Sequence, residues 1–167
     1  MITMGIDPGY ERLGLAIIET TNSSPDNLLY STCLTTSKTD IFPDRLKQLA
    51  EDAERLLKKY RPDTLAIEEL FFSGNQKTAM RVSEVRGMIM YLGLRAGAAI
   101  INLTPLQVKM SITGYGRASK SQVAAMIGKL VKIPPGQRHD DEYDAIAVAL
   151  AGAAHARHTL IHTRTSN

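Results

Sequence analysis

The order of the short apolar runs is the feature that most constrains the fold of this chain. Three runs, Ile2–Ile6, Leu13–Ile18 and Leu28–Thr35, follow one another with only turn-rich segments between them. Two more, Thr64–Glu68 and Ala98–Leu103, each follow a segment of helical length. Strands joined by tight turns pair antiparallel, whereas strands joined through helices usually pair parallel. The order therefore predicts an α/β fold with one mixed sheet, antiparallel over its first three strands and then parallel, with helices on both faces.

Apolar residues at helical spacing occupy the segments between and after these runs. The predicted helices span residues 40–60, 76–96, 105–112, 120–131 and 141–156. Pro105 suits the first turn of its helix, and Ser119 can cap the next one. A chain of 167 residues, 44% of them apolar, fits a single core. We expect one domain over residues 1–156, followed by a flexible polar tail over 157–167.

The location of the protein is predicted from what the sequence does not contain. No window approaches the roughly 18 consecutive apolar residues of a membrane span. The N-terminal MITMGIDPG leads into a strand pattern without the features of a secretory signal. The single cysteine, Cys33, cannot form an intramolecular disulfide, and we expect it to be a buried strand residue. These features predict a cytoplasmic protein with no membrane partner.

Charge is distributed unevenly along the chain, although the net charge is only +3. Residues 71–138 contain ten Lys or Arg residues and a single acid, Glu84. Segregation of this kind predicts a basic surface for a polyanion such as nucleic acid. The alternative is a solvated basic face that binds no ligand.

Acidic residues stand at three places where apolar residues would otherwise pack. Asp7 ends the first predicted strand and Glu68 ends the fourth. Asp141 and Asp144 lie three residues apart at the start of the last helix, so they project from one face. Carboxylates gathered in one cleft repel each other, and divalent cations offset that repulsion. Two such ions can catalyse phosphodiester hydrolysis, which agrees with a basic surface for a polyanion.

Each acid also has a purely structural interpretation. Asp7 precedes Pro8 and Gly9 and could cap a turn. The acids at the start of the last helix could simply favour its positive end. Asp144 and Glu68 are harder to explain in this way, because both border strongly apolar segments. Taken together with the charge segregation, the four acids favour a metal site.

Five motifs in order resemble the RuvC family of bacterial Holliday-junction resolvases, which has a ribonuclease-H-like fold. The motifs are GIDPGYERLGLAII, LAIEELFF, LQVKM, SKSQV and HDDEYDAIAVALA, and they extend from Gly5 to about Ala154. The resemblance implies a nuclease that nicks two strands of a four-way DNA junction symmetrically during recombination and repair. It implies two Mg²⁺ or Mn²⁺ ions per site, held by the four acids at motif positions: Asp7, Glu68, Asp141 and Asp144.

The resemblance also implies the surface that contacts DNA. Lys109 and Lys120 correspond to family lysines of the catalytic surface, where an ammonium group can stabilise charge on a phosphate. Phe71 corresponds to an aromatic residue placed against the junction bases, and Phe72 could share that role. The remaining predicted DNA contacts lie in the basic segment: Lys77, Arg81, Tyr115 and Arg117.

The resemblance further implies a homodimer, because one site cuts one strand and a resolved junction needs paired cuts. The helix over 76–96, with Met80, Met88 and Met90, is the predicted interface; the alternative is that these methionines belong to the core. Branch-migration machinery and a nucleoid-associated location are further implications of the resemblance.

Several alternatives stay open from the sequence. His139 could ligate metal instead of, or beside, Asp141, whereas Glu69 should point to the other side of its strand. The tail histidines could bind a transition metal if the tail were helical; they are His155, His158 and His162. The rival functions are a fragment of a sugar-kinase or actin-like ATPase, suggested by the GIDPG turn, and a module that binds branched DNA without cutting it.

Overall fold

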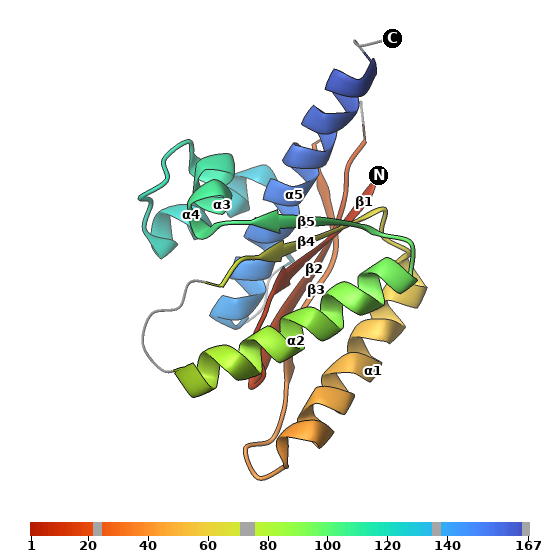
Figure 1. Cartoon of the computed structure of the whole chain (residues 1–167). Helices are drawn as coiled ribbons and strands as arrows, with labels where there is room; N and C mark the ends of the chain where they lie inside the picture. The colour runs from red at the N-terminus through yellow and green to blue at the C-terminus, as the bar shows by residue number, and fades with distance from the viewer. Residues whose placement is uncertain (22–24, 71–75, 135–137, 165–167) are drawn as a thin grey trace.

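A computed structural model describes residues 1–21, 25–70, 76–134 and 138–164 of the chain (Figure 1). Its centre is a five-stranded sheet with the order β3-β2-β1-β4-β5. The strands are β1 (Ile2–Asp7), β2 (Arg12–Glu19), β3 (Asn27–Thr35), β4 (Thr64–Glu68) and β5 (Ala99–Leu103). The β1–β2 and β2–β3 pairs are antiparallel, and the β1–β4 and β4–β5 pairs are parallel. The predicted mixed sheet is therefore confirmed, strand by strand.

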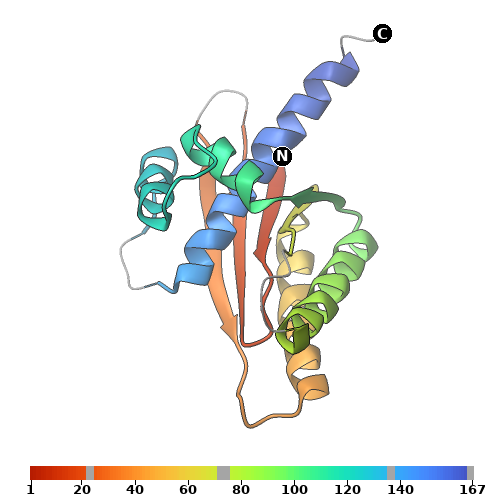
Figure 2. The ribbon, with the colours of Figure 1, turned by 60° about the vertical axis from the view of Figure 1, so that its left-hand side comes forward.

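Helices cover both faces of this sheet, as predicted. They are α1 (Phe42–Tyr60), α2 (Gln76–Arg95), α3 (Pro105–Thr113), α4 (Lys120–Leu130) and α5 (Asp140–Arg164). Figure 2 shows the sheet between α1 and α2 on one side and α3, α4 and α5 on the other. Successive side chains of β2 point to opposite faces of the sheet, so this strand contributes to the hydrophobic core on both sides. Leu13, Leu15 and Ile17 pack toward α1 and α2, and Ala16 and Ile18 pack toward α5.

Helix α5 lies unusually close to the sheet because the contact is made by small residues. A Cβ atom added at Gly5 would lie 2.3 Å from the backbone nitrogen of Ala149, and one at Gly152 would lie 2.3 Å from the Cβ atom of Ala66. No larger side chain fits at either position without moving the helix. The run of small residues in α5 is thus explained by its close approach to β1 and β4.

Two boundary predictions are wrong. Helix α1 begins at Phe42 and not at residue 40. Helix α5 continues to Arg164 instead of ending near Ala156. The polar residues after Ala156 contain no Gly or Pro to break the helix, and Arg157 donates to both carboxylate oxygens of Asp26, at 3.0 and 3.1 Å. Residues 157–164, predicted as tail, are therefore helical, and the single domain over 1–156 stays a prediction.

The methionines of α2 do not all face the same way. Met80 is exposed, but Met88 and Met90 are partly buried and pack against the core beneath α1 and α2. The alternative of core packing thus holds for Met88 and Met90, and the predicted interface on this helix stays a prediction. Tyr91 and Leu94 are the other large apolar residues that α2 exposes.

Among the described residues, no helix combines the length and the apolar character needed to cross a membrane.

Candidate active site

Two of the four predicted metal-binding acids end neighbouring parallel strands. Ile6 of β1 is paired with Ile67 of β4, so Asp7 and Glu68, the next residues, leave the sheet at the same edge. Parallel strands present their carboxyl ends on one side, where polar side chains can meet above the core. The fold thus brings together two acids that are 61 positions apart in the chain.

Helix α5 adds the other two acids at this edge. Gly14 of β2 is paired with Asp7 of β1, and a Cβ atom at Gly14 would lie 2.0 Å from the carbonyl oxygen of Asp141. The first turn of α5 therefore sits directly against the strand residue that neighbours Asp7. Asp144, one turn further along the helix, lies on the same side as Asp141.

The electrostatics of these acids show that their charges act on one another. The pKa of Asp7 is raised from 3.8 to about 7, mainly by burial and then by the charges of Asp144, Glu68 and Asp141 in that order. Burial also raises the pKa of Glu68, and Asp144 is the next largest cause. Like charges in a partly desolvated cleft disfavour ionisation, which is the physical reason for both shifts.

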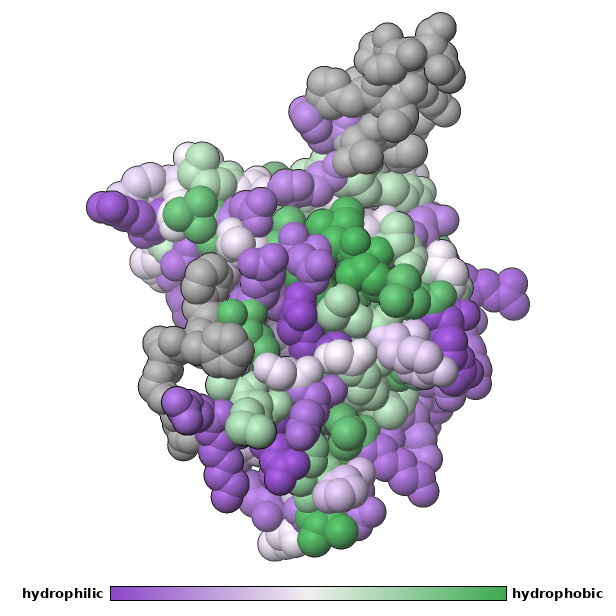
Figure 3. Space-filling view, in the orientation of Figure 1, coloured by the Kyte–Doolittle hydropathy of each residue, from purple (hydrophilic) through white to green (hydrophobic). Residues whose placement is uncertain are grey.

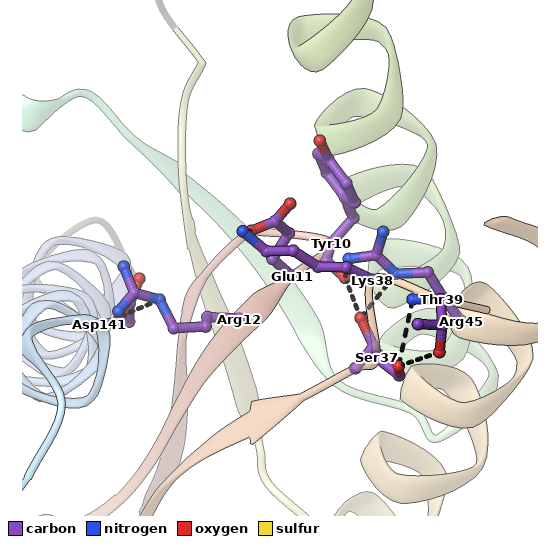
Figure 4. Close-up of polar contacts among 9 residues, drawn as sticks. Tyr10, Glu11, Arg12, Ser37, Lys38, Thr39, Arg45 and Asp141 are labelled. Atoms are coloured by element: carbon purple, nitrogen blue, oxygen red, sulfur yellow. Dashed lines mark hydrogen bonds and ion pairs between the residues drawn. The ribbon is translucent and has the colours of Figure 1, made fainter. Parts of the chain in front are cut away.

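Basic side chains pair with the two acids of α5. The ammonium group of Lys120, in the first turn of α4, donates to Oδ2 of Asp144 at 2.9 Å. This hydrogen bond raises the pKa of Lys120. Nε of Arg12 lies 3.1 Å from Oδ2 of Asp141 (Figure 4). The positive charge of Lys109, on α3, acts on Glu68 and opposes the rise in its pKa. Both predicted lysines thus lie at the acidic cluster.

The chemistry of the donor set fits a hard divalent cation, although the side chains do not form a closed cage. Oδ2 of Asp141 is buried and accepts no hydrogen bond from the residues that the structure describes, since Arg12 lies at ion-pair distance without hydrogen-bonding geometry. A buried carboxylate oxygen in this state is a suitable ligand for Mg²⁺ or Mn²⁺. Within the described part of the chain, however, no three His, Cys, Asp or Glu side chains are grouped closely enough to hold a metal ion. The predicted two-metal site therefore stays a prediction.

The neighbours of these acids in the sequence have other surroundings. Glu142 is buried, accepts from Ser31 Oγ at 2.6 Å and pairs with Arg138 at 2.8 Å, so it holds α5 to β3. His139 is exposed, and its carbonyl oxygen accepts the N–H of Glu142 at 3.1 Å. The backbone N–H of Glu69 donates to the carbonyl oxygen of Leu103 at the end of β5. A metal-binding role for His139 remains open.

The other predicted DNA contacts are placed on two elements. Lys77 and Arg81 lie in the first two turns of α2, where Arg81 stacks over the ring of Phe42 at 3.9 Å. Tyr115 and Arg117 are exposed in the loop between α3 and α4. Phe71 and Phe72 lie outside the described residues, as does the side chain of His162. Cys33 is half-buried on β3 opposite Gly14, so it is less buried than predicted.

Arg12 is the site residue that the sequence analysis missed. A usable signal was present in the hairpin itself: a short turn after Asp7 must start the returning strand at the same edge of the sheet. A charged side chain at that position therefore lies beside the acid that ends the first strand.

Comparison with known proteins agrees with this geometry. The family model described as "Crossover junction endodeoxyribonuclease RuvC" matches residues 3–152. The chain belongs to the RuvC family. The RuvC protein of Ruminiclostridium cellulolyticum is 41% identical over 162 residues, covering 96% of this chain and 97% of the relative. That of Alkaliphilus oremlandii is 42% identical over 153 residues, covering 92% and 93%.

Solved structures place the fold of this RuvC family member among resolvases. The structure of T. thermophilus RuvC in complex with Holliday junction substrate superposes with a TM-score of 0.89 at 30% identity, covering 95% of this chain and 96% of that one. The yeast mitochondrial Holliday junction resolvase has a TM-score of 0.69 at 14% identity, which shows a shared fold alone. The predicted ribonuclease-H-like class is confirmed.

Proposed function

We propose that this chain is a structure-specific DNA endonuclease that resolves four-way junctions by metal-dependent hydrolysis of phosphodiester bonds. The observation that carries the proposal is the meeting of Asp7, Glu68, Asp141 and Asp144 at one edge of the sheet, where burial and the charges of the other three acids raise the pKa of Asp7 to about 7. Membership of the RuvC family supports the endonuclease chemistry. Likeness to T. thermophilus RuvC, whose structure contains Holliday junction substrate, supports the choice of DNA.

The roles of the four acids follow from their places. Burial raises the pKa of Asp7 and the charges of the other three acids act on it, so we assign it the role of the central ligand that would hold the metal. Glu68, Asp141 and Asp144 surround it and would complete the metal shells. When bound, two divalent ions such as Mg²⁺ activate water and stabilise the leaving oxygen in hydrolysis. The carboxyl group of Asp7 must be ionised to serve as a ligand, which gives its high pKa a functional consequence.

The lysines supply positive charge on the side where a phosphate would bind. Lys120 is exposed, its ammonium group donates to Asp144 and its charge lowers the pKa of both Asp7 and Glu68, so it acts on three of the four acids. Lys109 acts on Glu68 from α3. Neither lysine needs to transfer a proton: each places a fixed cation where negative charge accumulates on the phosphate during cleavage.

We further propose that the active form is a homodimer that uses the outer face of α2. Met80, Tyr91 and Leu94 are large apolar side chains, each about 60% exposed or more. Their spacing of eleven and three residues places them on one stripe of the helix, together with Gly87, whose surroundings are open. Figure 3 shows hydrophobic residues exposed among hydrophilic ones over the area of β5 and α2. An apolar stripe with a small residue at its centre suits close packing of two helices across a two-fold axis.

Replacement of Asp7 tests the proposed function. We expect Asp7→Asn to bind a synthetic four-way junction in EDTA at least as tightly as the wild type, because it removes a negative charge beside the DNA surface. We expect its cleavage rate in Mg²⁺ to fall by at least about a hundredfold, because an amide is a poor ligand in place of a carboxylate. Gel-shift titration and single-turnover cleavage measure the two quantities.

Asp140→Asn is the matched control, since Asp140 is exposed on the same helical turn as Asp141. It should leave cleavage within about threefold of wild type. Retained cleavage in Asp7→Asn would reject the site, and loss of binding together with cleavage would show that Asp7 is structural. A wild-type protein that binds junctions in EDTA but makes no nicks in Mg²⁺ or Mn²⁺ would favour the non-cutting module.

A further inference from the structure

Arg12 contacts the acidic cluster through Asp141, whereas Lys120 contacts it through Asp144. It is the first residue of β2 and lies two positions before Gly14, the backbone partner of Asp7. Its Nε atom lies 3.1 Å from Oδ2 of Asp141, with the two side chains 54% and 20% exposed respectively. Figure 4 shows this ion pair apart from the contacts around Arg45. The cation is therefore at the mouth of the site and its acidic partner is further inside.

Asp141 has little freedom to avoid this contact. Its carbonyl oxygen is packed so tightly on β2 that a Cβ atom at Gly14 would lie 2.0 Å away. Its Oδ2 atom is buried and accepts no hydrogen bond from the described residues. The charge on that oxygen is thus compensated by the nearby guanidinium and not by hydrogen bonds, so an incoming cation would have to displace the guanidinium but no hydrogen-bond donor of the described residues.

The contact between Arg12 and Asp141 is easier to break than the contact between Lys120 and Asp144. Lys120 forms a true hydrogen bond with Asp144 and its charge acts on Asp7 and Glu68 as well. The Arg12 contact lacks hydrogen-bonding geometry and involves a half-exposed side chain, so breaking it costs little. A guanidinium stays charged at every accessible pH, so a change of pH does not remove it.

We propose that Arg12 competes with a divalent cation for Asp141 and thereby weakens metal binding by the DNA-free protein. A metal ion and the guanidinium cannot occupy the same side of Oδ2, so the ion can bind that oxygen only after the guanidinium has left it. The inference rests on the proposed function only in taking Asp141 as a metal ligand. It assigns Arg12 a positioning role that acts through that carboxylate.

Binding of Mn²⁺ to the DNA-free protein, followed by electron paramagnetic resonance or calorimetry, tests this proposal. We expect Arg12→Gln and Arg12→Ala to bind Mn²⁺ about two- to fivefold more tightly than wild type, the range expected for loss of a half-exposed ion pair. Lys38→Gln is the matched control, because Lys38 makes a 3.2 Å ion pair with Glu11 near the same turn and away from the acids (Figure 4). Its Mn²⁺ affinity should equal that of wild type.

A double variant makes the test specific. In an Asp141→Asn background, Arg12→Gln should no longer change the Mn²⁺ affinity, since the shared carboxylate is gone. Equal or weaker Mn²⁺ binding by the Arg12 variants, including no measurable binding by any protein, would overturn the proposal. So would an effect that persists without Asp141. This experiment measures Mn²⁺ affinity and not junction cleavage. Its outcome is therefore independent of the Asp7 experiment, which tests the proposed function.

Discussion

At the scale of single residues, Asp7 shows that an ionisable side chain buried at the proposed active site lowers the stability of the folded protein. Its ordinary pKa is 3.8 but burial and three neighbouring carboxylates raise it to about 7 in the folded protein. Between these two values the folded state keeps a proton that the unfolded state releases. The free energy of unfolding must therefore fall as the pH rises through this window, and level off above about pH 7.

This linkage gives a prediction for Asp7→Asn in EDTA. Asparagine does not titrate, so only the wild type loses stability as the pH rises. The difference in the free energy of unfolding between the variant and the wild type should therefore widen, in favour of the variant, by about 1–2 kcal/mol between pH 5 and pH 8. Urea unfolding at several pH values measures the gap. A gap that is constant or that shrinks as the pH rises would show that Asp7 is not destabilised by its ionisation.

Single residues also show which parts of the candidate site could be predicted from the sequence and which could not. Asp7 and Glu68 could be predicted from strand ends, because a strand terminus follows from a short apolar pattern. The Arg12–Asp141 contact could not, since it depends on how closely α5 approaches β2. The close approach of α5 to β2 is possible because Gly14 has no side chain. A hydrophobic periodicity in the sequence does not reveal that a helix packs closely at this glycine.

At the scale of elements, the packing of α5 against the sheet determines the positions of Asp141 and Asp144. Gly14→Ala would place a Cβ atom 2.0 Å from the carbonyl oxygen of Asp141, so the first turn of α5 must move. We expect a loss of about 2 kcal/mol or more in the free energy of unfolding, with cleavage reduced beyond what stability explains. Urea midpoints and cleavage rates well below the unfolding transition measure both effects.

Gly128→Ala on α4 is the matched control, because a Cβ atom there would meet nothing within 4 Å. Alanine in a helix interior should raise stability by about 0.5–1 kcal/mol and leave cleavage unchanged. If Gly14→Ala behaved like this control, the close packing of α5 on β2 would not position the acids.

Element boundaries were predicted well where a strong local signal exists. The capping boxes of Thr104 with Gln107 and of Ser119 with Gln122 begin α3 and α4 where proline and serine indicated. The end of α5 was missed because its last turns are fixed by a contact between Arg157 and Asp26, which are 131 positions apart. Only long-range contacts of this kind separate a helix from a polar tail of the same composition.

At the scale of the whole molecule, the proposed homodimer would depend on the outer face of α2. We expect Tyr91→Glu combined with Leu94→Glu to weaken this dimer by at least about a hundredfold, since two of the three large apolar side chains of the stripe are replaced by charges. Sedimentation velocity measures the dissociation. Paired cuts on a junction should fall relative to single nicks, because separate protomers cut independently.

Ile41→Glu provides the comparison, because Ile41 is 65% exposed but precedes α1 and lies outside the stripe. It should leave the association state unchanged. A double α2 variant that still sediments as the wild type does would place the interface elsewhere.

The position of α5 after all other described elements has a consequence for synthesis on the ribosome. This helix fills one face of β1, β2 and β4 and carries Asp141 and Asp144. A nascent polypeptide that stops short of it lacks half of the carboxylates and leaves that face of the sheet bare. Truncated products would therefore expose the apolar side chains that α5 normally covers and would lack the complete set of four acids.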